Sequence, residues 1–240
     1  MVLKAVTEMS EAQATLDRAL ADMTGSLRSS RDEEQQRDRL KNGLFELNRI
    51  LREEHTTEEL LEYTLAFMAA FLDAGVGIIY RYDEHEKLLI PATTYAVSLA
   101  DRPDNGRIMP GEGLVGQVAV NRKPVHLQTV PSGYLPIASA LGEADPSQIA
   151  VLPIQHNGLL TGILELGSFK PFDDYSFSFL EQALEGIAVA INSNRSRRLI
   201  SELLEQTQVQ AEELRVREEE LQQTNQELQE RARILEGRTG

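Results

Sequence analysis

The 240-residue chain contains no cysteine and no tryptophan. Without cysteine it can form no disulfide, no thiolate nucleophile, no sulfur-ligated zinc site and no thioether link to a chromophore. Aromatic residues make up only 5% of the chain, which fits a protein with much helix exposed to water. No apolar run approaches 18 residues, and no signal-peptide pattern opens the sequence. We therefore expect a soluble, cytoplasmic protein.

Positive charge is also scarce, and the net charge is −14. Residues 43–193 hold 20 acidic and 9 basic side chains, so this region alone carries −11. A nucleic-acid-binding surface needs clustered Lys and Arg, which this region lacks. The tight basic group of Arg195, Arg197 and Arg198 is interpreted as a solvated helix face. We expect no nucleic-acid partner.

Composition divides the chain into three predicted parts, residues 1–42, 43–194 and 195–240. The first part favours helix and has a sparse apolar stripe that needs a partner. The middle part holds most of the proline, glycine and β-branched residues and is predicted to be globular. The last part is predicted to be one polar helix with a single apolar seam. The stripe of the first part consists of Leu16, Leu20, Met23 and Leu27.

Periodicity in the middle part predicts an α+β domain built around a largely antiparallel sheet. A capping box of Thr56 and Glu59 opens a helix that Gly75 ends. Asn157-Gly158 between apolar runs predicts a hairpin, and Asp173 or Asp174 caps a final helix. The remaining elements are a helical face at 44–51, strands at 76–82, 88–95, 125–127, 149–155 and 159–166, a helix at 113–121, and a loop at 130–147 that holds one helical turn.

From residue 200 onward, Ile or Leu recurs every seven positions, with Thr207 in one of the six, which is the pattern of a coiled coil. Asn225 on this seam suits a parallel pair of helices, because two Asn side chains can hydrogen-bond across the axis. Traced backwards, the register reaches small residues on the final helix of the domain, beside its sheet-facing stripe. We predict one continuous helix from about 176 to 235 and a parallel homodimer; the alternative is that the small residues are solvent-side helix formers. The predicted interface comprises Phe179, Ala183, Gly186, Ala190, Ser193, Ile200, Leu204, Ala211, Leu214, Leu221, Asn225, Leu228 and Leu235.

No catalytic constellation is found. Gly111, Gly113 and Gly116 satisfy G-x-G-x-x-G, but a proline and a polar loop precede them where a dinucleotide site needs a buried strand. His126, beside apolar neighbours, is the one residue to consider as a haem ligand, and a structural role is favoured. No histidine is spaced with a second ligand for a metal. We expect no enzyme activity in this segment, no cofactor and no metal.

The middle part resembles the GAF family of small-molecule-sensing domains. The resemblance covers 43–194 and is carried by Pro110–Ala119, Lys123–Val125, Ile149–Pro153, Gly162–Gly167 and Phe172–Asp174. It implies a GAF-like antiparallel sheet with helices. The cyclic-nucleotide signature of some members is absent, and so is the cysteine that other members use to attach a bilin or to reduce methionine sulfoxide.

The flanks resemble parts of bacterial sensor histidine kinases, often hybrid ones. Residues 22–27 are similar to the end of a HAMP linker, and residues 203–235 to a signalling-helix coiled coil. These resemblances imply a signal-relay module of a two-component receptor whose kinase domain is absent from this chain and whose parent is anchored in the inner membrane. The alternative is a ligand-free dimerisation scaffold.

The domain's charge of −11 disfavours an anionic ligand, so an uncharged small molecule, or none, is expected. A loop as long as 130–147 either closes over a pocket or fills the core, and both interpretations stay open. If a pocket exists, the resemblance places it between this loop and the sheet. Its predicted lining is Ile78, Tyr80, Thr94, Tyr134, Ser139 and Leu152.

Overall fold

One unbroken helix, α1 (Val2–Arg52), opens the chain in the computed structural model, which describes residues 2–99, 103–131, 133–139 and 142–236. Its last three turns carry a stripe at helical spacing that packs against the core of the domain. This stripe consists of Leu40, Leu44, Leu47 and Leu51. The helix passes residues 42 and 43 without a break, and the domain boundary predicted there stays a prediction.

The capping box opens helix α2 (Thr57–Leu72) as the sequence predicts. The Thr56 side chain accepts from the backbone N–H of Glu59, and the Glu59 carboxylate accepts from the backbone N–H of Thr56. The predicted end at Gly75 is wrong. Asp73 ends the helix in the left-handed region at φ 59°, which Asp tolerates better than most residues, and Gly75 lies inside the following strand.

Five antiparallel strands form the sheet in the order β2-β1-β7-β6-β3. The tight turn before β7 has Asn157 at φ 50° and Gly158 at φ 77°, the conformation that an Asn-Gly hairpin requires. The fold class predicted from the sequence is confirmed. The strands are β1 (Ala74–Asp83), β2 (Leu88–Tyr95), β3 (Val125–Leu127), β6 (Gln148–His156) and β7 (Leu159–Ser168).

Strand β2 is an edge strand, and a register irregularity opposite Pro91 marks the bulge that proline requires. Its outer edge is partly closed by Ile108, which exchanges two backbone hydrogen bonds with Leu89 (2.9 and 3.0 Å). The segment that returns to β2 contains the short helix η1 (Pro103–Gly106) and leads into α3 (Gly113–Asn121).

The loop predicted at 130–147 holds a small two-stranded sheet instead of a helical turn. Strand β4 (Ile137–Ser139) pairs antiparallel with β5 (Gly142–Ala144). Leu135, just before this hairpin, is 1% exposed within the core. In its described residues the segment therefore contributes side chains to the core.

Helix α4 (Asp174–Glu236) is continuous, as predicted. Asp173 accepts the backbone N–H of Ser176 over 2.7 Å and so caps its first turn. The chain forms two compact units, residues 1–191 and 192–240, and α4 contributes to both. Among the described residues, no helix combines the length and the apolar character that a membrane span requires.

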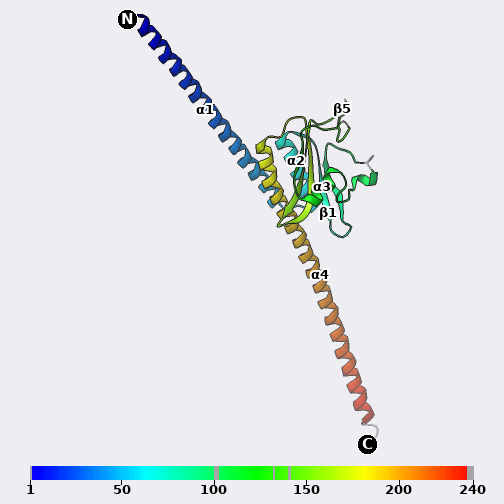
Figure 1. Ribbon diagram of the computed structural model, residues 1–240. Helices are drawn as coiled ribbons and strands as arrows, with labels where there is room; N and C mark the ends of the chain where they lie inside the picture. The colour runs from blue at the N-terminus through cyan, green and yellow to red at the C-terminus, as the bar shows by residue number, and fades with distance from the viewer. Residues whose placement is uncertain (1, 100–102, 132, 140–141, 237–240) are drawn as a thin grey trace. The chain divides into compact units, whose positions relative to one another are not determined.

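Two apolar clusters lie on opposite faces of the sheet (Figure 1). On one face, α1, α2 and the first part of α4 cover strand residues such as Ile79 and Leu152. On the other face, α3 and the segments flanking it cover residues such as Ile78 and Val151. Because neighbouring strand residues point to opposite faces, these pairs separate into the two clusters.

Candidate functional site

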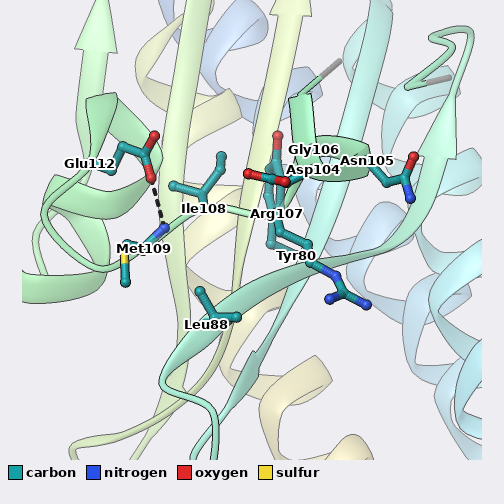
Figure 2. A pocket seen from close by; sticks show the side chains of 9 residues that line it. All are labelled: Tyr80, Leu88, Asp104, Asn105, Gly106, Arg107, Ile108, Met109 and Glu112. Atoms are coloured by element: carbon teal, nitrogen blue, oxygen red, sulfur yellow. Dashed lines mark hydrogen bonds between the residues drawn. The ribbon is translucent and has the colours of Figure 1, made fainter. Parts of the chain in front are cut away.

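A hollow of about 770 Å³ lies on the α3 side of the sheet, between β1, β2 and the segment that leads to α3. Figure 2 shows the side chains around it. A hollow of this size can hold a small organic molecule. Its lining consists of Tyr80, Leu88, Asp104, Asn105, Gly106, Arg107, Ile108, Met109 and Glu112.

Three consecutive lining residues adopt left-handed backbone angles, namely Asp104 (φ 51°), Asn105 (φ 53°) and Gly106 (φ 74°). Asp and Asn tolerate this region better than other non-glycine residues, because their short polar side chains can hydrogen-bond locally. These three residues turn the chain along the edge of the hollow.

Two hydrogen bonds, one of them to a side-chain carboxylate, connect the rim of the hollow to the first turn of α3 and its N-cap residue. Gly111 donates from its N–H to the backbone oxygen of Gly116 (2.8 Å), and Glu112 accepts the N–H of Met109 on its carboxylate (3.0 Å). A Cβ at Gly116 would lie 2.4 Å from the backbone oxygen of Met109. The third glycine of the G-x-G-x-x-G pattern thus permits a close approach between helix and rim. Within the described residues 103–110, no buried strand precedes the motif.

A buried carboxylate lies behind the hollow. Glu165, in the central strand β7, is 3% exposed and accepts a hydrogen bond from the Tyr80 hydroxyl over 3.2 Å. Its strand neighbours are Ile78 and Val151, both fully buried. A buried polar group is costly unless it is hydrogen-bonded, so the Tyr80 hydroxyl helps to stabilise Glu165 in the core. Sequence analysis missed Glu165, although one acidic residue within the apolar run Gly162–Gly167 was a visible signal.

The predicted ligand residues are only partly brought together. Tyr80 lines the hollow, while Ile78 is buried in the same apolar cluster. Thr94 is exposed on the edge strand, and Tyr134 is half-buried beside the core. Leu152 lies away from the hollow, because strand alternation turns its side chain to the opposite, helix-covered face. Ser139, the last of the six predicted residues, lies in β4. Its side chain lies outside the described part.

The contacts of His126 indicate a role in packing. Its Nε2 lies 3.0 Å from the side-chain oxygen of Gln148, which also accepts the backbone N–H of Phe172. Its ring lies 4.8 Å from that of Phe177. These contacts join β3 to the start of α4. Among the described residues, no group of three or more histidine or acidic side chains is arranged to hold a metal ion.

The upstream part of the predicted dimer interface divides into covered and open residues. Phe179 and Ala183 are each 1% exposed, so their own chain leaves them no surface for a partner. Gly186 and Ala190 are half-buried, and a Cβ at Gly186 would lie 3.4 Å from Leu51 of α1. Ser193 is exposed.

Downstream, the predicted seam is open to solvent in the single chain. Its large apolar side chains are 58–67% exposed, and Ala211 and Asn225 are exposed as well. The side chain of Leu235 lies outside the described part. The parallel homodimer stays a prediction. The exposed large residues of the seam are Ile200, Leu204, Leu214, Leu221 and Leu228.

The comparisons with known proteins agree with this fold. The chain belongs to the GAF domain family, whose model matches residues 54–192. No curated protein sequence matches the chain.

Several solved structures share the fold at low sequence identity. The GAF domain of a Coxiella burnetii phosphoenolpyruvate-protein phosphotransferase is 20% identical, with a TM-score of 0.57, over 67% of this chain and 96% of that one. The corresponding Acinetobacter domain is 17% identical (TM-score 0.52; 68% and 95% covered). The free methionine-R-sulfoxide reductase of Neisseria meningitidis, solved with its substrate, is 18% identical (TM-score 0.54; 66% and 91% covered).

Proposed function

We propose that the chain is the sensory and signal-relay module of a two-component receptor, in which a parallel homodimer passes an input to a histidine kinase domain. The observation that supports this most is helix α4. The first part of this helix packs into the core of the GAF domain, which belongs to a family of sensory domains. The same helix continues past the domain, and the apolar seam of that continuation is exposed. Such a seam is stable in water only when a second helix covers it.

The input side of the proposal has two parts. Helix α1, similar in residues 22–27 to the end of a HAMP linker, would bring a signal from a membrane-anchored part of the receptor. The hollow beside Tyr80 would bind a small molecule, for which the acidic domain disfavours an anion. A relay of this kind needs two packings of the helix pair that differ by a few kcal/mol, which either input can rebalance.

Glu218 tests the relay. It follows Leu204 and Ala211 at seven-residue spacing, so it places a charge on the predicted seam and weakens one packing. We expect Glu218→Leu to stabilise the dimer and to bias kinase output in a full-length receptor, measured as autophosphorylation. Glu219→Leu, one position off the seam, is the matched control. An output that responds equally to both changes, or to neither, contradicts the relay.

A second candidate function is a ligand-free scaffold that only sets dimer geometry. It is favoured by the burial of Ile78 and Leu135 in the core, where the sequence allowed a pocket. Native mass spectrometry of the purified protein separates the two functions. A bound compound, or a melting temperature raised by one, supports the sensor, and neither is expected of a scaffold.

A further inference from the structure

We propose that a second copy of this chain covers the outer face of α1 and α4 in the GAF domain, with α1 of each copy packed on α4 of the other. The proposal rests on the homodimer proposed above and names the surface that this dimer uses at the level of the domain. We call this surface the α1–α4 face, and its residues are Lys41, Phe45, Arg52, Gln182, Glu185 and Val189.

The interface predicted from the sequence is not open to a partner in the first part of α4. Its residues Phe179 and Ala183 are each 1% exposed, because their own chain already covers them. A Cβ at Gly186, further along the same stripe, would lie 3.4 Å from Leu51 of α1. In the domain, α1 thus occupies the side of α4 that a partner helix would need. A second copy therefore has to approach the two helices from their outer face.

Helices α1 and α4 run in the same direction where they meet. Leu40 and Phe179 line one small hollow, and the contact at Gly186 lies further along both helices. Phe45 and Gln182 each lie about midway between these two contacts, so they are level with each other. A two-fold axis parallel to both helices keeps these levels. In the proposed arrangement, Phe45 of one copy therefore lies opposite the partner's Gln182.

Two large apolar side chains of the α1–α4 face are exposed in the single chain. Phe45 is 69% exposed and Val189 is 45% exposed, although Leu44 and Leu47 beside Phe45 pack in the core. Aromatic side chains are common anchors of protein interfaces. Single exposed apolar residues are also common on free surfaces, so the charges around these two residues decide what covers them.

The outer face of α1 is positively charged. Lys41 and Arg52 are exposed, one turn before and two turns after Phe45, and within the described part neither has an ion-pair partner. Arg49, between them, forms ion pairs within its own helix region. Helix α1 therefore presents an aromatic ring between two cations.

The outer face of α4 has the opposite charge. Its exposed charged residues between 176 and 190 are Glu181 and Glu185, and Glu185 lies 3.4 Å from Nδ1 of His156. Packing α1 on the partner's α4 brings Lys41 and Arg52 toward these carboxylates. Packing α1 on the partner's α1 would instead bring like charges together, which interfaces avoid. Charge complementarity therefore favours a second copy in the crossed arrangement.

Single cysteines test this arrangement, because the chain has none of its own and every disulfide must then join two copies. Asn48 is exposed on α1, one turn after Phe45. The 240-residue chain with Asn48→Cys and the chain with Gln182→Cys are co-expressed under different tags and oxidised. We expect a disulfide-linked pair that carries both tags on non-reducing gels. Glu62→Cys, an exposed site on α2, replaces Asn48→Cys in the control and should give no such pair.

Phe45→Ser measures what the exposed ring contributes to the dimer. We expect the dissociation constant from sedimentation equilibrium to rise by about tenfold or more, because aromatic anchors carry much of the binding energy of an interface. Phe169→Ser is the control, since Phe169 is also exposed (52%) but lies outside the α1–α4 face.

Three outcomes would overturn the inference. They are a dimer that gives no disulfide between differently tagged chains, disulfides that form only between two Asn48→Cys chains, and a dissociation constant that Phe45→Ser leaves unchanged. Each of these outcomes leaves the homodimer of the proposed function intact, because the protein still sediments as a dimer. An unaltered protein that sediments as a monomer would count against both.

Discussion

Arg39 of α1 donates a hydrogen bond from Nη2 to the backbone oxygen of Phe71 over 2.8 Å. Its guanidinium also lies 5.2 Å from the centre of the Phe71 ring. Phe71 lies in the last turn of α2, where backbone oxygens have no partner within the helix. The centre of the Phe71 ring also lies 4.4 Å from that of Phe179 in α4. Three helices thus meet at one side chain, and we call Arg39, Gly43, Phe71 and Phe179 the Phe71 joint.

Arg39→Ala should loosen the Phe71 joint. The change removes one charge-assisted hydrogen bond and one cation–π contact, each worth about 1 kcal/mol at a partly exposed site. We expect the free energy of unfolding to fall by about 1–2 kcal/mol in urea titrations. Arg37→Ala, an exposed change on the same helix, is the control. Equal stability of the two variants would mean that the Arg39 contacts contribute nothing.

Gly43 and Gly25 make a matched pair on α1. A Cβ at Gly43 would lie 2.4 Å from the Phe71 ring, whereas nothing lies within 4 Å of one at Gly25. Alanine favours helix over glycine by about 1 kcal/mol. We therefore expect Gly25→Ala to be neutral or stabilising and Gly43→Ala to destabilise the fold by about 1–3 kcal/mol, because the Phe71 ring must move. Calorimetric melting temperatures measure the difference, and a rise for Gly43→Ala would contradict the packing.

The capping box makes stability depend on pH. The backbone N–H and then the hydroxyl of Thr56 hydrogen-bond to Glu59 and hold the pKa of its carboxyl below the ordinary value of 4.5. A lowered pKa in the folded state stabilises the fold above the unfolded pKa, and this contribution is lost as pH falls through the folded pKa. Glu59→Gln should therefore flatten the fall in stability below about pH 4.5. Glu58→Gln is the control, and urea titrations across this range should show no such flattening for it.

The predicted coiled coil can be tested with two apolar residues of α4. Leu221 lies on the seam and Val216 does not, although both are exposed in the single chain (58% and 47%). In a parallel dimer, Leu221→Glu would bury two like charges opposite each other, so we expect dissociation at micromolar concentration. Val216→Glu should leave the dimer intact. Sedimentation velocity measures both, and the same mass for the two variants would rule out this register.

Local signals predicted the elements well, because each rests on chemistry within a few residues. The Thr56–Glu59 box, the Asn157-Gly158 turn and the bounds of α3 are of this kind. The short strands β4 and β5 were missed, since only Ile137 among their six residues is β-branched and none is aromatic. The unbroken course of α1 was also missed, because charged residues interrupt its apolar pattern before Leu40.

The candidate site was predicted less well, because it depends on contacts between distant segments. The hollow forms where Ile108 returns to Leu89, which no local pattern indicates. The Tyr80–Glu165 pair depends on the register between β1 and β7. Alternation could show that Val151 and Leu152 face opposite sides, but only the tertiary fold shows which side carries the hollow.

Gly116 couples the rim of the hollow to helix α3. With no side chain at this position, the backbone of Met109 and Gly111 lies directly against α3, and the hydrogen bond from Gly111 to Gly116 holds it there. We therefore expect the rim and α3 to move together. A molecule that displaces the rim would displace α3 as well. Binding would then shift the position of Asn121, at the end of α3, and of the short strand β3 that follows it.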